Sequence, residues 1–207
     1  MHFTQADHET LLRLLAWRRD VRHFRADPLP EGTASELRRA LDLAPSVGNA
    51  RPWRVIEVAS AEFRAAVHEL FLKANAEAAA AQDAARRDHY ARLKLEGMRT
   101  APLQLAVFTD TAPVEGGGLG RHSMPETLEQ STAMAVQNLN LVARALGLGV
   151  GMVSILDPRA MERLFEVPES WRFNLYLCIG RPEFTDDTPL LHRNGWQCNT
   201  PTRWRSV

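Results

Sequence analysis

Three arginines and one aspartate stand within five residues near the start of the chain, in the segment Arg18-Arg19-Asp20-Val21-Arg22. Arginine presents a planar fork of donors that stays charged at any working pH, so such a cluster suits the binding of a phosphate. Asp20 could serve as a base or as an anchor for its neighbours. Taken alone, however, the segment favours a simpler interpretation, the solvated basic end of a helix whose charges complement the helix dipole.

A second stretch that could do chemistry is the turn at residues 44–53, which contains Ser46, Gly48 and Asn49. Short polar side chains beside a glycine leave backbone and amide donors free to meet the edge of a ring or a phosphate. An ordinary helix-to-strand loop explains the same residues. For this turn considered alone, the ordinary loop is the preferred interpretation.

These two stretches and three later ones resemble the FMN-dependent nitroreductase-like proteins and, within them, the 5,6-dimethylbenzimidazole synthases of cobalamin biosynthesis. Residues 18–22 and 44–53 are typical of the whole superfamily. The branch is indicated by Lys94-Leu95-Glu96-Gly97, by Gly118-Leu119-Gly120-Arg121 with Met124-Pro125-Glu126, and by residues 149–158. The resemblance extends from about Arg18 to about Trp196.

The fold that this resemblance implies is α+β and nitroreductase-like, with a mixed, mainly antiparallel sheet flanked by helices. It also implies an intertwined homodimer with FMN at the interface. Residues 1–207 would form a single FMN-binding domain. About 72–98 and 112–124 are expected to be lid-like segments, and 181–207 a C-terminal extension that wraps around the partner subunit.

The activity that the resemblance implies is the oxygen-dependent fragmentation of reduced FMN, which is itself the substrate. The flavin ring is contracted to 5,6-dimethylbenzimidazole, the lower ligand of cobalamin, and erythrose 4-phosphate is released. Molecular oxygen is the co-substrate, and NAD(P)H would act indirectly, through a separate flavin reductase. Two alternatives stay open: an NAD(P)H-dependent nitroreductase or flavin reductase on the same scaffold, and a flavin-binding protein without turnover.

The resemblance also implies the residues of the site. Asp20 is expected to be catalytic as a base or orienter near the ribityl hydroxyls, and Ser154 as a hydrogen-bond partner of the isoalloxazine. The expected flavin contacts are Arg18, Arg19, Asp20, Val21, Arg22, Ser46, Asn49, Leu95, Ser154 and Arg193. Arg51 stands where related sequences often carry a glutamine before the Pro-Trp pair.

Composition excludes several other classes of function. Lys and Arg together number 25, as do Asp and Glu, so nothing indicates a nucleic-acid partner. The start of the chain lacks the pattern of a signal peptide, and no apolar stretch is long enough to span a bilayer, so we expect a cytoplasmic protein without a membrane partner. Cys178 and Cys198 lack metal-ligand spacing, and no metal site is expected.

Periodicity and turn residues predict the elements that must position these groups. We expect helices capped by Asp7, by a Thr33–Glu36 capping box and by a Ser123–Glu126 capping box, and we expect Gly97 at a helix C-terminus. Strands are predicted at 53–58, 103–109, 152–156 and 173–179. Glycines 147, 149 and 151 are expected to let the backbone approach a flat ligand closely.

Overall fold

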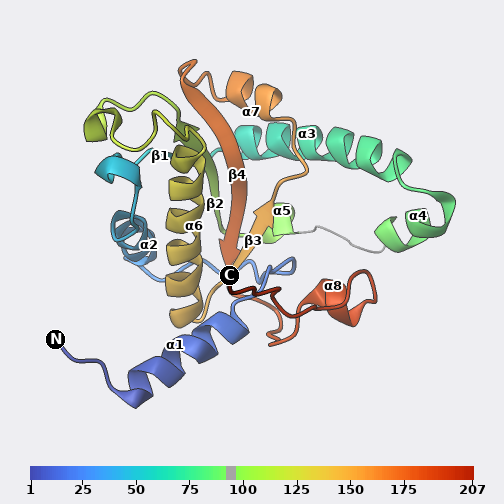
Figure 1. Ribbon diagram of the computed structural model, residues 1–207. Coiled ribbons are helices and arrows are strands. Elements are labelled where there is room, and N and C mark those ends of the chain that lie inside the picture. Colours follow the sequence, from blue (N-terminus) through green and yellow to red (C-terminus); the bar gives the residue numbers. More distant parts are fainter. Residues whose placement is uncertain (92–96) are drawn as a thin grey trace.

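The computed structural model describes residues 1–91 and 97–207, and among them four strands form one sheet in the order β1-β2-β4-β3 (Figure 1). The strands are β1 (Trp53–Glu57), β2 (Leu103–Asp110), β3 (Gly149–Val153) and β4 (Trp171–Gly180). All four predicted strands are found, and β3 begins three residues earlier than expected. These strands pair antiparallel, and the sheet is mixed only through a parallel bridge between Asp20 and Val150, as far as the described chain goes.

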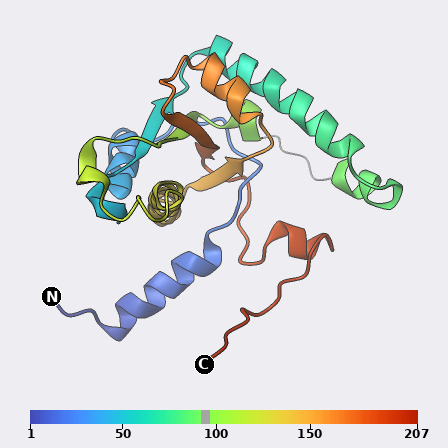
Figure 2. The same ribbon diagram turned by 45° about the horizontal axis from the view of Figure 1, so that its top comes forward.

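Helices cover both faces of this sheet. The helices are α1 (Gln5–Trp17), α2 (Thr33–Asp42), α3 (Ala61–Ala80), α4 (Ala84–Ala91), α5 (Gly97–Thr100), α6 (Thr127–Ala145), α7 (Pro158–Leu164) and α8 (Leu190–Arg193), with short 3-10 turns η1 (Val47–Asn49) and η2 (Glu115–Gly118). Figure 2 looks nearly along α6 and shows it beside the sheet. The arrangement confirms the predicted α+β architecture.

The central strand β2 explains why there are two packed layers. All eight of its residues are buried, and alternate side chains point to opposite faces of the sheet. Leu103, Leu105 and Val107 pack with α2 and α6, whereas Ala106 and Phe108 pack with α3, α5 and α7. The sheet therefore has an apolar cluster on each side, and the site must lie at an edge or an end.

Helix α1 starts at a different residue from the one predicted. Its N-cap is Thr4, whose hydroxyl accepts a hydrogen bond from the Asp7 N–H, while the Asp7 carboxylate accepts one from the Thr4 N–H at 2.8 Å. Asp7 is thus the third residue of a capping box and not the cap itself. Within the described chain, α1 buries none of its residues.

The other capping predictions are wrong. Helix α2 starts at Thr33 after Gly32, and the Thr33 hydroxyl donates to the Pro30 carbonyl at 2.7 Å. Helix α6 starts at Thr127, after both Ser123 and Glu126, and the Thr127 hydroxyl donates to the Met124 carbonyl at 2.7 Å. These hydroxyls satisfy upstream carbonyls in place of helix N–H groups, a competition that threonine and serine commonly enter.

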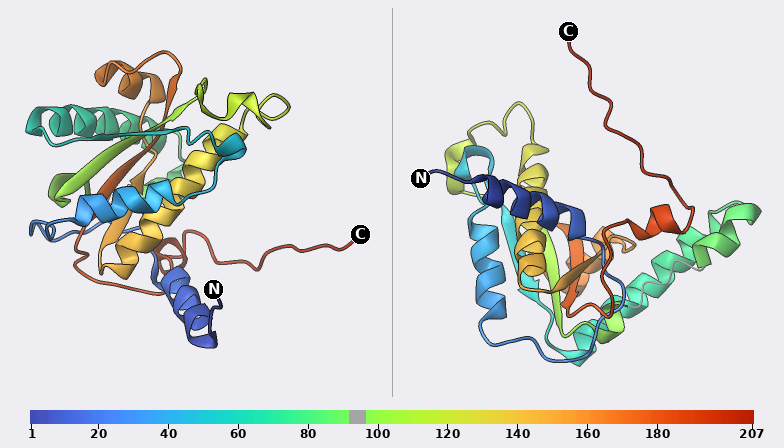
Figure 3. Two further views of the ribbon diagram at one scale, coloured as in Figure 1. Left: turned by 90° about the vertical axis from the view of Figure 1, so that its left-hand side faces the viewer. Right: turned by 90° about the horizontal axis from the view of Figure 1, so that it is seen from below.

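The helices α3 and α4 form an arm that projects from the body (Figure 1). Arg64 anchors the base of the arm, because its guanidinium donates to the Val58 carbonyl at 2.7 Å and to the Pro102 carbonyl at 2.9 Å. Gly97, predicted to end a helix, instead begins α5 beside this base. At the other end of the chain, residues 200–207 run away from the body in extended form (Figure 3).

The segment that carries the arginine cluster lies along β3. The Val21 N–H donates to the Val150 carbonyl at 3.0 Å, and the glycines of β3 make room for this contact. A Cβ atom at Gly149 would lie 2.5 Å from Val21 Cγ2, and one at Gly151 would overlap the Val21 carbonyl oxygen. Gly149 therefore makes room for the Val21 side chain and Gly151 for the Val21 backbone, where the sequence predicted a flat ligand.

Replacing Gly151 by alanine should disrupt the packing of the arginine segment on β3 and destabilise the protein. Because the added methyl group meets a backbone carbonyl that cannot rotate away, we expect a loss of about 2 kcal/mol or more in the free energy of unfolding, measured by chemical denaturation. Gly147→Asn is the matched control, since Gly147 has no neighbour within 4 Å and asparagine tolerates its φ of +75°. Equal stability of Gly151→Ala and the parent protein would contradict the described packing.

Candidate functional site

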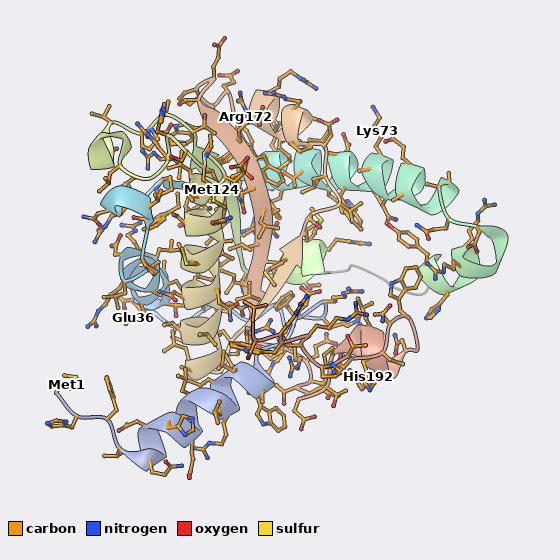
Figure 4. All side chains as sticks on the ribbon, in the orientation of Figure 1. Met1, Glu36, Lys73, Met124, Arg172 and His192 are labelled. Atoms are coloured by element: carbon orange, nitrogen blue, oxygen red, sulfur yellow. The ribbon has the colours of Figure 1, made fainter. Side chains whose placement is uncertain are left out.

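A pocket lies where the end of α1 meets β3, the C-terminal half of α6 and the segment before α8. Its walls come from residues 17–23, from Asn140 and Arg144 on α6, from Leu148 and Gly149, and from residues between Phe184 and Arg193. We call it the arginine pocket. Figure 4, in which His192 marks α8, shows how densely side chains fill the region between α8, the end of α1 and the lower end of the sheet.

The arginine pocket carries an excess of positive charge. Of the described residues that line it, five are arginines, namely Arg18, Arg19, Arg22, Arg144 and Arg193, and two are aspartates, Asp20 and Asp186. Each aspartate is paired: Arg22 Nε lies 3.2 Å from Asp20 Oδ2, and Arg193 Nη1 lies 2.8 Å from Asp186 Oδ2. The remaining guanidinium charge makes the pocket a binding site suited to an anion.

Asp20 holds the arginine segment in place. Its Oδ1 accepts a hydrogen bond from the Met152 N–H at 2.8 Å, and its Oδ2 accepts one from Arg22. The side chain remains 35% exposed, so the carboxylate also faces the pocket. Asp20 is therefore both an anchor and a group that a ligand can reach.

A smaller hollow, the inner pocket, lies on the other side of residues 20–22. Gly97 and Met98 of α5, residues 151–153 of β3 and Cys178 of β4 complete its walls. Burial, with the nearby charge of Asp20, raises the pKa of Cys178 to about 12, so the thiol stays protonated and is no nucleophile. Ser154 follows β3 directly and is exposed at the end of this wall.

The segment before α8 closes one side of the arginine pocket. Arg19 donates to the backbone carbonyls of Ala16 and Asp187, which ties the end of α1 to this segment. Partial burial and the neighbouring Arg18 charge lower the pKa of Arg19, and the charges of Asp187 and Asp186 oppose that shift. The predicted contact Arg193 lies in the same wall, which brings it together with the residues 18–22 from the other end of the chain.

Three buried donors in the arginine pocket have no hydrogen-bond partner among the residues that the structure describes: Arg19 Nε, Arg22 Nη1 and Asn140 Nδ2. Native proteins pair nearly all such groups. The pocket thus offers N–H donors as well as positive charge. Both features fit a ligand that is anionic and rich in hydrogen-bond acceptors.

Ser46 and Asn49 lie away from this pocket within one chain. Asn49 ends the η1 turn and Ser46 directly precedes it, and the turn is held at the start of α6 by a hydrogen bond from the Val47 N–H to Ser131 Oγ at 3.1 Å. Asn140 lies about 13 Å further along α6 at the helical rise of 1.5 Å per residue. Leu95, another predicted contact, lies outside the described residues.

Arg51 takes part in the same turn. Its backbone N–H donates to Ser46 Oγ at 3.0 Å, and its guanidinium lies 3.9 Å from Asp42 Oδ1. Its φ of +44° shows that the turn holds it in the left-handed region. Within one chain, then, Arg51 supports the turn that carries Ser46.

Asn140, Arg144 and Asp186 are among the pocket residues that the sequence reasoning missed. Asn140 and Arg144 stand one helical turn apart and so share a face of α6, but the wide apolar arc of that helix assigned it to the core. Asp186 sits in a polar tail without periodicity. No signal in the sequence joins these residues to the arginine cluster, because the chain brings them together only when it folds.

The chain belongs to the nitroreductase family, whose sequence pattern matches residues 15–181. It is 58% identical to a 5,6-dimethylbenzimidazole synthase of Rhodobacter capsulatus over 204 residues, which cover 99% of each chain. A 5,6-dimethylbenzimidazole synthase of Rhodospirillum rubrum is 52% identical over 188 residues, 91% of this chain and 89% of that one.

A solved structure with the same fold is that of oxidized iodotyrosine deiodinase bound to FMN and 3-iodo-L-tyrosine. It aligns with a TM-score of 0.75 at 20% identity and covers 95% of this chain and 100% of that one. Together with the family match, this confirms the predicted nitroreductase-like fold. Among the described residues, no helix is long and apolar enough to cross a membrane, and no three metal-ligating side chains gather.

Proposed function

We propose that this protein catalyses the oxygen-dependent fragmentation of reduced FMN to 5,6-dimethylbenzimidazole, with release of erythrose 4-phosphate. The observation that carries the proposal is the 58% identity, over 99% of both chains, to a protein of that name. The arginine pocket supports it, because FMN combines a phosphate, a chain of hydroxyl groups and a flat ring. When bound, reduced FMN would supply both the electrons for oxygen and the atoms of the product.

The residues of the arginine pocket have separable tasks in this proposal. Arg18, Arg19 and Arg193 hold the flavin phosphate by charge and by their forks of donors. Arg22 and the Met152 N–H orient Asp20, whose exposed edge can take a proton from a ribityl hydroxyl. Val21 lines both pockets and packs against the ligand. In this proposal the exposed Ser154 hydroxyl, just beyond the inner pocket, hydrogen-bonds the isoalloxazine.

The site is completed by a second copy of the chain in this proposal. Helix α1 leaves its apolar stripe uncovered, with Leu11, Leu12 and Leu15 between 40% and 51% exposed. A short amphipathic helix gains its stability from packing that face, so a partner is expected to cover it. The homodimer also accounts for Ser46 and Asn49, which would reach the flavin from the partner subunit.

The tail divides into two parts in the same proposal. Residues up to Trp196 pack on their own chain, through the bridge from Phe24 to Pro182 and through α8. Residues 198–207 are exposed and carry no secondary structure. We assign the wrapping around the partner subunit to this last part of the predicted 181–207 extension.

The arm fits the role of a lid over the flavin, corresponding to the expected segment 72–98. Its outer helix α4 rests on Trp196 of the tail: the ring centroids of His89 and Trp196 are 5.3 Å apart, and the Arg86 guanidinium lies 5.8 Å from the Trp196 ring. The Trp196 N–H donates to the Leu191 carbonyl of α8 at 3.0 Å, and α8 ends at Arg193, so the arm is linked to the wall of the arginine pocket. A covered site keeps water from reactive species during turnover.

The second expected lid, residues 112–124, packs closely on η1 of its own chain. A Cβ atom at Gly116 would lie 2.7 Å from the Gly48 carbonyl oxygen, so the two turns are packed together as one unit. In the proposed dimer this unit reaches the partner's flavin. The reduced FMN would come from a separate NAD(P)H-dependent flavin reductase in the cytoplasm.

The reaction is tested by product analysis in air. The purified protein is mixed with FMN, NADH and a separate flavin reductase, and small molecules are read by mass spectrometry. We expect 5,6-dimethylbenzimidazole to appear with loss of FMN, and to be absent without oxygen. Intact FMN despite sustained reduction would refute the proposal: steady NADH oxidation without the added reductase would then identify a nitroreductase or flavin reductase, and stoichiometric binding alone a flavin-binding protein.

Within that assay, Asp20→Asn should bind FMN and lose product formation by about 100-fold or more, because the amide keeps the shape but cannot take a proton. The matched control is Asp27→Asn, which removes another aspartate paired with an arginine, at 2.7 Å from Arg25, outside the arginine pocket. The control should keep full activity. Full activity of Asp20→Asn would remove Asp20 from the mechanism.

The homodimer is tested by light scattering after gel filtration, where the parent protein should show the mass of two chains. Leu12→Glu places a charge in the uncovered stripe of α1 and should give a monomer that binds FMN at least about tenfold more weakly. Leu43→Glu at the end of α2 is the control, since Leu43 is an exposed leucine (71%) outside α1, the arm and the tail. A monomeric parent protein, or a dimeric Leu12→Glu variant with unchanged affinity, would contradict this interface.

The lid is tested with Trp196→Ala. Loss of the aromatic and cation–π contacts should shift the arm toward an open state by about tenfold, so reduced FMN would reoxidise with less product and trypsin would cut the arm faster. Leu43→Ala is the control, because Leu43 is 71% exposed at the end of α2 and belongs neither to the arm nor to the tail. Identical product yield and proteolysis for both variants would show that Trp196 does not hold the arm.

A further inference from the structure

Asn140 is a buried polar residue that the proposed function leaves without a role. It lies on α6, is only 2% exposed and lines the arginine pocket. Its side-chain Nδ2 has no hydrogen-bond acceptor among the described residues. By contrast, Asn138 on the same helix points to α2, where its Nδ2 lies 3.5 Å from the Ala40 carbonyl oxygen.

A buried donor without an acceptor destabilises the folded state, since it has lost its hydrogen bonds to water and gained none in return. Such a group is explained when a ligand supplies the acceptor. Asn140 projects from a long, well-packed helix, which holds its amide in one place. A donor fixed in this way can select for an acceptor at one position in the pocket.

The charges around Asn140 indicate which part of a ligand it meets. Arg144 stands one turn further along α6 and lines the same pocket, so both side chains lie on one face of the helix. Neither Arg18 nor Arg144 forms an ion pair with a carboxylate in the described part of the chain, so both charges remain to be matched. An anionic acceptor belongs at this wall.

We propose that Asn140 is a further binding residue of the arginine pocket, whose side-chain N–H donates to a phosphate oxygen of FMN. Together with Arg144 it makes α6 a wall of the phosphate site that faces the residues 18–22. The contact lets the pocket select the phosphorylated flavin over riboflavin. This inference rests on the proposed function, which supplies FMN as the ligand.

The test is equilibrium binding of oxidised FMN and of riboflavin, followed by quenching of flavin fluorescence, with the full-length protein and without a reductase. Asn140→Leu should weaken FMN binding by about tenfold or more, as expected for one hydrogen bond to a charged group. Riboflavin affinity should stay within about twofold. The ligand-free variant should melt roughly 2–4 °C higher, because the unpaired buried amide is gone.

Two further variants sharpen the result. Asn140→Asp keeps the shape but puts a negative charge near the phosphate, so it should lower FMN affinity more than Asn140→Leu does and leave riboflavin binding unaffected. Asn138→Leu is the matched control on the same helix and should bind both flavins as the parent protein does.

Unchanged FMN affinity in Asn140→Leu, with altered melting alone, would reduce Asn140 to a structural residue and overturn the inference. An equal loss for FMN and riboflavin would overturn the assignment to the phosphate. The proposed function fails separately, if the parent protein forms no 5,6-dimethylbenzimidazole.

Discussion

The hydrogen bond from the Met152 N–H to Asp20 Oδ1 joins the arginine segment to the sheet, and the rest of the site depends on it. Strand β3 is largely buried and paired with β4, so a bond to its backbone fixes the direction in which residues 18–22 present their side chains. The bond is possible because Gly149 and Gly151 have no side chains that would hold Val21 away. The edge strand β3 therefore positions the residues that line the arginine pocket.

The positive charge of the arginine pocket destabilises the folded protein, and the aspartates of the pocket offset this repulsion only in part. Guanidinium groups that line one pocket repel one another, and burial strengthens the repulsion. Asp20 and Asp186 each pair with one arginine, which leaves the others to be balanced by an anionic ligand. Ligand binding and stability of the pocket are therefore coupled, and an anion that fills the pocket should stabilise the folded state.

The elements that sequence reasoning predicted well are those whose signal is local. The four strands were found because short apolar runs bounded by turn residues are a local signal of buried strands, although the bounds of β3 were three residues off. The capping box at Thr33 was wrong because the Thr33 hydroxyl satisfies an upstream carbonyl instead of a helix N–H. The one at Ser123 was wrong because α6 begins only at Thr127, four residues later. Gly149 and Gly151 were predicted to face a ligand, since a sequence shows that a close approach is needed but not what approaches.

The sequence by itself determined the strands, the nitroreductase-like fold through its resemblance, and the cluster of residues 18–22 as the binding candidate. Only the tertiary structure decided that Arg193 and Asp186 from the tail and Asn140 and Arg144 from α6 join that cluster, while Ser46 and Asn49 stand at the far end of α6. The physical reason is that local signals depend on neighbours in the chain. Contacts between segments more than a hundred residues apart depend on how helices and sheet pack.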